Sequence, residues 1–586
     1  MFRLRTRGPS LLLAAMAFTG ITMLDPIYDP GASRFSAGEY DRPVKMPQSR
    51  SAVIASHGIV ATSQPLAAQV GLDILKAGGN AIDAAIATDA MMGLVEPMSC
   101  GIGGDLFCIY WDAKTQKLYG LNASGRSPYA LNREVFKKKG LKEIPTSGIL
   151  SWSVPGCVDG WDQLSKRFGT LPLSKLVAPA IQSAEEGFPV SQVIAGFWKR
   201  GEPLARFYPD TGATYYPHGH APAEGELFHN PNLAASLKAI AEGGRDAFYR
   251  GPIADQIVAY SQANGGYFSK KDFEDHTSTW VDPVSTNYRG YDVWELPPNG
   301  QGIAALQILN ILEGYDLHSM GRHSPDYLHL FIEAKKLAYA DRAKYFADPE
   351  FAKLPVAELI SKEYAARQRK RINPKRAASS VDPGDPLLAK GSDTIYLCVV
   401  DKDRNCCSLI QSNFNGFGSR LVPGKVGFVI QNRGCQFSLD PQHLNTLEPH
   451  KRPFHTIIPA MVTKDGKPWY VFGVMGGDMQ PQGHVQVLVN MIDFGLNVQA
   501  AADAGRVRHD GSQTPTSQPM EAGGGEVNVE SSIPQATLDE LAKRGHHIVH
   551  KADGGFGGYQ GIWIDQLHGT IHGGTEPRTD GAAVGY

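Results

Sequence analysis

The stretch KGSDTIYLCVVDKDRNCC, residues 390–407, contains an abrupt change from a polar loop to an apolar strand. Thr394 stands at this step and is followed at once by the run IYLCVV. Side chains alternate between the two faces of a strand, and both faces of this run are apolar. We therefore expect the strand to be covered on both sides. DKDRN (401–405) predicts a turn, and CCSLIQS predicts a returning strand.

The position of Thr394 suggests a chemical role. A threonine hydroxyl is a weak nucleophile that needs a base. If the Asp393–Thr394 peptide bond is cut, Thr394 gains an α-amine, and such an amine has a reference pKa of about 7.7–8.0. That amine can take the hydroxyl proton of its own residue. A loop that can be released, followed by a rigid strand, suits this chemistry, although a threonine that merely begins a strand is the simpler alternative.

A second segment could support the same chemistry. AMVTKDGKPWYVFGVMGG (460–477) predicts a hairpin that turns at Asp465-Gly466 and ends in Gly476-Gly477, and a helix is expected in QGHVQVLVNMIDFGL. Backbone N–H groups at such a helix start are free to bind a negative oxygen. The glycines of SCGIGGDLF (99–107) precede a strand rather than a helix, so a phosphate-binding loop is not indicated.

Composition excludes several classes. The 586 residues carry a formal net charge of -2 without a long basic block, which argues against a nucleic-acid partner. The seven cysteines include no C-x-x-C, so neither a disulfide framework nor a zinc site is indicated. We expect no metal and no other cofactor.

The N-terminus differs from the rest of the chain. MFRLRTR is basic, and SLLLAAMAFTGITML is apolar but short for a membrane span. Residues 1–50 therefore predict a signal or anchor-like segment and a linker. The protein is expected to be exported, either to the periplasm or as a membrane-anchored form, and a cytoplasmic protein with an N-terminal extension is the alternative.

Local signals predict several helices. Ser63 to Leu75 is expected to be helical, and Asn80, with Asp83 as a capping-box partner, is expected to begin a second helix. Residues 130–390 are expected to be mainly helical with polar loops. Asp478 is expected to cap the helix after the glycine pair, and His484 to be a polar position of that helix.

Several segments, in one order along the chain, resemble the gamma-glutamyltransferase family of N-terminal-nucleophile hydrolases. The resemblance runs from about residue 53 to 586. DTIYLCVVDKDRN matches the family segment that carries the catalytic threonine, which identifies Thr394, and VMGGD matches the oxyanion glycines, Gly476 and Gly477. The other matching segments are GIVATSQPLAAQVGLDILKAGGNAIDAAIA, SCGIGGDLF, DAFYRGPIADQIV, ELPPNGQGIAALQILNIL and EPRTDGAAVGY.

The resemblance implies a four-layer αββα sandwich made as one precursor. Thr394 would attack the carbonyl of Asp393 and divide the chain into a large subunit, 51–393, and a small subunit, 394–586. Both would remain in one catalytic domain. Thr394 would then form an acyl-enzyme from a γ-glutamyl or glutaryl-type amide and pass it to water or an amine, while Gly476 and Gly477 stabilise the oxyanion.

The segments expected to bind the substrate carboxylate depart from the family pattern. Two serines of the family fall on His455 and Thr456 in RPFHTIIP. Thr456 keeps a hydroxyl, and His455 can still donate a hydrogen bond. Arg126, in GLNASGRSP, is the candidate for the family's carboxylate-binding arginine, although it stands two places closer to the proline. A surface arginine is the alternative.

The segments expected to bind the substrate amine depart further. The family's aspartate that holds the substrate ammonium aligns with Gln436. The family's glutamine or glutamate before that aspartate aligns with Arg433, and a further asparagine aligns with Phe414. Ser412 replaces the threonine that holds the nucleophile's amine, and Asn413 lies beside it. Because Gln436 and Arg433 offer no anionic partner for an ammonium, we expect that a free α-amine on the substrate is not strongly required. In this respect the chain resembles the cephalosporin-acylase-like branch of the family.

The segment between Ser438 and Lys451 is short compared with the lid loop of many family members. We expect an open cleft, unless another loop covers it. Three functions are considered: an acylase for glutaryl-type groups, a glutathione hydrolase that recognises the amine differently, and an inactive relative that serves as a binding protein. The intact Thr394, Gly476 and Gly477 argue against the last.

Overall fold

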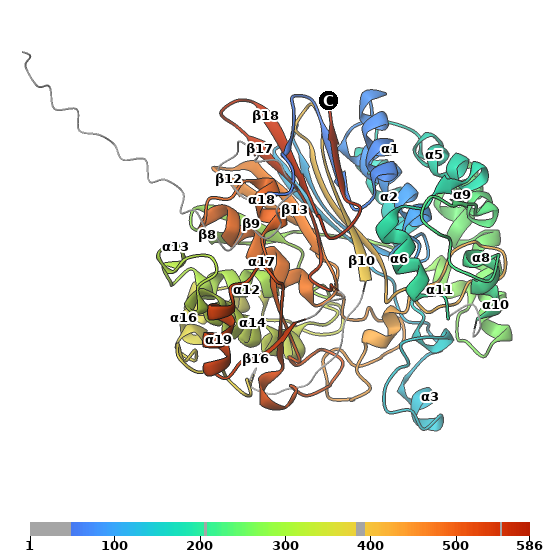
Figure 1. Ribbon diagram of the computed structural model, residues 1–586. Coiled ribbons are helices and arrows are strands. Elements are labelled where there is room, and N and C mark those ends of the chain that lie inside the picture. Colours follow the sequence, from blue (N-terminus) through green and yellow to red (C-terminus); the bar gives the residue numbers. More distant parts are fainter. Residues whose placement is uncertain (1–47, 204–207, 383–392, 551–553) are drawn as a thin grey trace, which may run out of the picture.

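The computed structural model describes residues 48–203, 208–382, 393–550 and 554–586, and Figure 1 shows their arrangement. The expected signal or anchor segment and most of its linker lie outside the described residues. So do residues 383–392, which include the end of the loop expected to be released. None of the described helices is long and apolar enough to cross a membrane.

Two seven-stranded sheets form the centre of the molecule, and all of their neighbouring strands are antiparallel. The first sheet has the order β1 (Val53–Ala55), β18 (Thr570–Thr575), β17 (Gly558–Asp565), β13 (Lys467–Met475), β12 (Ala460–Lys464), β9 (Tyr291–Glu295) and β8 (Val284–Tyr288). The second has the order β19 (Ala582–Gly585), β2 (Ile59–Thr62), β10 (Asp393–Val400), β11 (Cys406–Phe414), β3 (Asp105–Asp112), β4 (Lys117–Ala123) and β7 (Thr279–Val281).

Helices cover the outer face of each sheet (Figure 1). Over the second sheet lie α1 (Pro65–Lys76), α2 (Ala81–Val95), α4 (Cys157–Phe168), α5 (Leu173–Glu186), α9 (Pro231–Tyr249) and α10 (Pro252–Ala263). Over the first lie α12 (Gly302–Leu312), α14 (Pro325–Tyr345), α17 (Met479–Ile492), α18 (Val498–Asp503) and α19 (Gln535–Lys543). The expected αββα sandwich is confirmed.

Thr394 is the second residue of β10, which lies between β2 and β11 inside the second sheet, and the two faces of β10 pack as the sequence predicts. Ile395, Leu397 and Val399 pack toward the helical layer that contains α2. Tyr396 and Cys398 belong to the apolar cluster between the two sheets. Because both faces are buried, β10 is a rigid support for the threonine at its start.

Local signals predicted many elements correctly. Asn80 and Asp83 form the expected capping box at the start of α2. The first helix begins one residue later than the expected cap, because Gln64 accepts the free N–H groups while the Ser63 hydroxyl donates to Glu96. The hairpin between β12 and β13 turns at Asp465-Gly466, as expected.

The described part of residues 130–390 is mainly helical, as expected, apart from a stretch of strands. Residues 279–295 form β7, β8 and β9 rather than helix. β9 pairs with β12, a strand about 170 residues further along the chain. Pairing with a distant strand therefore favours the extended conformation of this segment. A small third sheet combines β14 (Val507–Asp510), β15 (Glu526–Val529) and β16 (His547–His550).

Candidate active site

Thr394 is held from the neighbouring strand. Its side chain is buried, and its Oγ1 donates a hydrogen bond to Ser412 Oγ at 3.1 Å. Ser412 Oγ in turn accepts the backbone N–H of Phe414 at 2.8 Å. The ladder between β10 and β11 is irregular between Asp393 and Ile395, so Thr394 sits at a local break in the pairing. The structure therefore places Ser412 beside Thr394, in contact with its hydroxyl, while the expected role of Ser412 toward the amine of Thr394 stays a prediction.

The glycine pair follows β13, the strand that faces β10 across the two sheets. A Cβ at Gly473 would lie 2.4 Å from the Tyr396 ring, so β13 approaches β10 closely at that position. Gly476 and Gly477 have φ values of 123° and 58°, which glycine adopts more readily than other residues. They precede α17 directly, and the backbone N–H groups of such a junction can bind a negative oxygen.

The residue after the glycines does not cap the helix as expected. The Asp478 side chain makes no capping hydrogen bond. Instead its Oδ1 accepts a hydrogen bond from Arg342 Nη1 at 2.6 Å. His484 is likewise not an ordinary polar helix position, because it is fully buried and its Nδ1 lies 2.8 Å from Glu295 Oε1. Both side chains bind partners that lie far away in the sequence, so the sequence pattern does not reveal their contacts.

Arg433 has the most unusual environment in the site. It is fully buried, and its guanidinium lies over the Phe414 ring at 4.5 Å from the centroid. Nη1 donates to Thr456 Oγ1 at 2.6 Å. Nε and Nη2 are buried and have no hydrogen-bond partner among the described residues. A buried donor without an acceptor is costly, so this group is suited to bind an acceptor from a ligand.

The electrostatics near Arg433 favour an anion. Burial lowers the pKa of Arg433 to about 9, and the nearby Asp105 carboxylate opposes this shift. The guanidinium therefore remains cationic at neutral pH. No described carboxylate oxygen lies within salt-bridge distance of it. An anionic ligand would supply the missing charge and the missing acceptors together.

His455 is occupied by a buried carboxylate. Its Nε2 lies 3.0 Å from Asp105 Oδ2, and its Nδ1 accepts the backbone N–H of Ile457. Burial lowers the pKa of His455 well below its usual value, so the ring is neutral and Nε2 is the donor. Burial also raises the pKa of Asp105 to about 7. Asp105 was not predicted as a site residue, although it directly follows the glycines of SCGIGGD.

Arg126 is engaged within the protein. Its Nη2 donates to Glu350 Oε1 at 2.7 Å, and its Nη1 lies 3.6 Å from Asp348 Oδ2. Nη1 also donates to the backbone carbonyl of His450. Its guanidinium already has two carboxylate partners, unlike that of Arg433. A substrate-binding role for Arg126 stays a prediction.

Gln436 and Phe414 line a cavity of about 240 Å³. Carboxylates from other segments, Glu143 and Glu521, lie on the same cavity. The exchange of an aspartate for Gln436 therefore does not leave this cavity without acidic groups. Asn413 is directed elsewhere: its amide donates to the carbonyl of Cys100 at 2.8 Å and so supports the glycine-rich turn.

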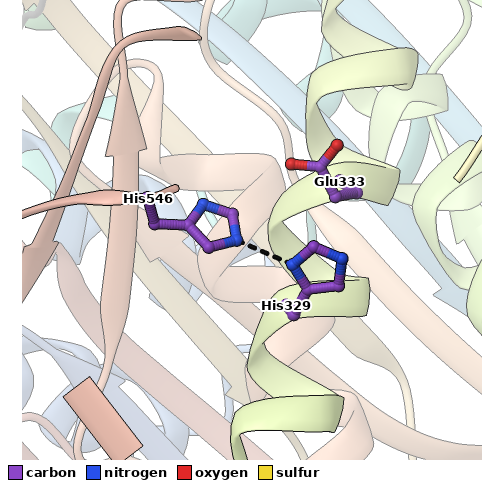
Figure 2. Close-up of side chains that lie close together, drawn as sticks. All are labelled: His329, Glu333 and His546. Atoms are coloured by element: carbon purple, nitrogen blue, oxygen red, sulfur yellow. Dashed lines mark hydrogen bonds between the residues drawn. The ribbon is translucent and has the colours of Figure 1, made fainter. Parts of the chain in front are cut away.

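A separate cluster contains His329, Glu333 and His546 (Figure 2). His329 Nε2 lies 2.7 Å from the Asn373 carbonyl, so Nε2 donates and Nδ1 accepts from His546 Nε2 at 2.8 Å. The two oxygens of Glu333 accept from Lys336 and from the backbone of Ala378. Every one of these ligand-type atoms is satisfied within the protein, and a lysine neutralises the carboxylate. The arrangement favours a structural hydrogen-bond network over a cation site.

Comparisons with known proteins agree with this geometry. The family model described as gamma-glutamyltranspeptidase matches residues 67–586. The chain is 40% identical over 543 residues to the glutathione hydrolase-like YwrD proenzyme of Bacillus subtilis (strain 168), which covers 91% of this chain and 99% of the relative. It is 34% identical over 557 residues to the glutathione hydrolase proenzyme of Escherichia coli (strain K12), which covers 91% of this chain and 93% of the relative.

A solved structure extends the likeness to the fold. The crystal structure of cephalosporin acylase from Bacillus halodurans matches with a TM-score of 0.85 and 45% sequence identity, and the match covers 94% of this chain and 99% of that chain. Both a glutathione hydrolase-like protein and an acylase are thus similar to this chain over nearly its whole length. The chain belongs to the gamma-glutamyltranspeptidase family of N-terminal-nucleophile acyl-transfer enzymes.

Proposed function

We propose that the precursor cuts its own Asp393–Thr394 bond and that Thr394 is then the nucleophile for amide substrates. The observation that carries the proposal is the placement of the buried Thr394 hydroxyl against Ser412, at the start of a rigid central strand. Gly476 and Gly477, at the end of the facing strand β13, supply the backbone N–H groups for the oxyanion.

The two reactions use the same atoms. In maturation, Thr394 Oγ1 attacks the Asp393 carbonyl carbon, the peptide C–N bond breaks, and the freed amine takes the hydroxyl proton. Water then hydrolyses the resulting ester and leaves a carboxylate on Asp393. In turnover, the α-amine of Thr394 takes the proton of its own hydroxyl, and Oγ1 attacks the carbonyl carbon of the substrate amide. The C–N bond of that amide breaks, and the substrate's amine leaves with the proton. Water or an acceptor amine finally takes the acyl group.

Arg433 determines the acyl group in this proposal. Its two unpartnered nitrogens and its hydrogen bond to Thr456 suit a carboxylate on the acyl chain. γ-Glutamyl and glutaryl amides both carry such a group. Arg126 stays a second candidate for this role, but its contacts with Glu350 and Asp348 make it the weaker one.

The α-amine is the feature that separates the two substrate types. The neutral Gln436 favours a glutaryl-type group, because it cannot pair with an ammonium as an aspartate does. Glu143 and Glu521 on the same cavity leave a γ-glutamyl group acceptable. The proteins that this chain resembles include both a glutathione hydrolase and a cephalosporin acylase.

The proposed cut also defines two chains, and the N-terminus bears on the cellular localisation of the protein. The large subunit would comprise residues 51–393 and the small subunit residues 394–586, and each would be the other's partner in one catalytic domain. The basic and then apolar N-terminus supports export to the periplasm or to a membrane-anchored form.

N-terminal sequencing of the purified protein tests the proposal. We expect a small subunit that begins at Thr394 and an uncut chain for the Thr394→Ala variant. Thr394→Ser, which keeps a hydroxyl, is the matched control and should still be cut. A small subunit that begins at another residue, or cleavage of Thr394→Ala, would contradict self-cleavage by Thr394.

A further inference from the structure

Gln301 connects the two halves of the candidate site. It lies at the start of α12 and is fully buried. Its Nε2 donates to the carbonyl of Gly477 at 2.9 Å and to the carbonyl of Thr456 at 2.7 Å. One side-chain amide therefore uses both of its hydrogens, one on the oxyanion glycines and one on the segment that holds Arg433.

The orientation of this amide is imposed from α14. Gln301 Oε1 accepts a hydrogen bond from Arg342 Nη1 at 2.6 Å, and the same nitrogen donates to Asp478 Oδ1. The Arg342 guanidinium lies over the Tyr339 ring at 3.9 Å, and the Tyr339 hydroxyl donates to the Asp478 carbonyl. Because a guanidinium can only donate, Oε1 must face Arg342 and the amide hydrogens must face the two carbonyls.

The glycine pair needs such support. Gly476 and Gly477 have no side chains whose packing would hold their peptide planes, and both have positive φ. The Gly477 carbonyl is held by the Gln301 amide and by the backbone N–H of Gln480. On the other side, Thr456 offers its carbonyl to Gln301 and its hydroxyl to Arg433. A displacement of Gln301 would therefore reach both groups.

We infer that Gln301 is a positioning residue that sets the oxyanion glycines at a fixed distance from the Arg433–Thr456 pair, and that Arg342 acts through it. The inference rests on the proposed roles of Thr394, Gly476 and Gly477. It adds that the spacing between the oxyanion and the acyl carboxylate is controlled by one amide. Misplacement of a donor by about 1 Å is enough to slow chemistry by about 100-fold.

The test variant is Gln301→Met, which keeps the side-chain volume and removes the amide. On processed enzyme with γ-glutamyl or glutaryl anilide, we expect kcat to fall about 10- to 100-fold. Gln307→Met is the matched control. Gln307 is buried in the same helix and donates to Asp341 of α14 at 2.8 Å, away from the glycines. It should lower the melting temperature by a similar amount while kcat stays within about twofold.

A double-mutant cycle separates positioning from general damage. Arg342→Lys should lower kcat about tenfold in the wild-type background and clearly less in Gln301→Met, since only the contact of Arg342 with Asp478 can still be lost there. Effects that multiply would overturn the inference, as would an unchanged kcat in Gln301→Met. If Gln301→Met does not mature, Gln301→Glu takes its place with the same expected loss of kcat, because it keeps an oxygen for Arg342 and removes both amide hydrogens. A wild-type enzyme without turnover would overturn the proposed function as well.

Discussion

At the scale of single residues, the proposed site combines Thr394, a candidate nucleophile typical of the family, with an unusual candidate pocket for the acyl group. Thr394 and the glycine pair were identified from quoted motifs, because these segments are contiguous in the sequence. Arg433 was identified by its position alone, and its contacts with Phe414 and Thr456 appear only in three dimensions. Asp105, the partner of His455, was missed because the two residues are 350 positions apart.

Substitution of Arg433 tests the carboxylate proposal. Arg433→Gln removes the charge and keeps a donor for Thr456. We expect kcat/KM for glutaryl anilide to fall about 10- to 100-fold, because a charge-assisted hydrogen bond to a carboxylate is lost. Pentanoyl anilide, which has the same chain length without the carboxylate, should change less than about threefold. Arg126→Gln is the matched variant, and an equal or larger loss there would assign the carboxylate to Arg126 instead.

Gln436→Asp in the same assay should shift the preference toward γ-glutamyl anilide, and an unchanged preference would show that Gln436 does not contribute to the selectivity of the pocket.

At the scale of elements, sequence patterns correctly predicted the features that depend on residues close together in the sequence. The capping box of α2, the turn at Asp465-Gly466 and the two-sided burial of β10 all follow from neighbouring residues. β8 and β9 were missed, because their pairing with β12 depends on residues far along the chain. Buried polar pairs such as Arg342 with Asp478 were missed for the same reason.

The buried helix α2 carries a carboxylate whose titration should be measurable. Asp89 is buried, its Oδ2 accepts from Trp161 Nε1 at 2.8 Å, and its Oδ1 has no partner among the described residues. Burial raises the pKa of Asp89 to about 7. Above the unfolded pKa of about 3.9, the folded chain therefore binds more protons than the unfolded chain, and the free energy of unfolding falls as pH rises toward 7.

The prediction concerns the difference between two proteins. In the uncut Thr394→Ala background, Asp89→Asn should remove this decline, so its advantage over the parent should grow by about 2–4 kcal/mol between pH 4 and pH 7. Guanidinium unfolding at several pH values measures it. Asp73→Asn, at an exposed position of α1, is the control for the chemical change itself, and the gain from Asp89→Asn should exceed the gain from Asp73→Asn. A difference for Asp89→Asn that does not change with pH would show that Asp89 is ionised in the folded protein.

At the scale of the whole molecule, the proposed cut falls inside a continuous architecture. In the second sheet, β2 of the proposed large subunit lies between β19 and β10 of the proposed small subunit. In the first sheet, β9 of the proposed large subunit pairs with β12 of the proposed small one. In the colours of Figure 1, β2 is blue, β10 is yellow and β19 is red, so neighbouring strands of the second sheet come from distant parts of the chain. The proposed cut lies between the first two residues of β10, so the pairing of β10 with β2 and with β11 from Ile395 onward stays within intact chain segments.

This arrangement predicts that the two processed chains unfold and separate in one step. Separation must break the hydrogen-bonded ladders on both sides of β2 and the apolar cluster between the sheets, so 1 M NaCl, which weakens only charge interactions, should not part the chains. Because unfolding of the cut protein releases two chains, its melting temperature should rise by about 2 °C for a hundredfold increase in protein concentration. The uncut Thr394→Ala chain unfolds without dissociation, so its melting temperature should not depend on concentration. Separation in salt, or two distinct transitions in the cut protein, would show that the subunits are independent folding units.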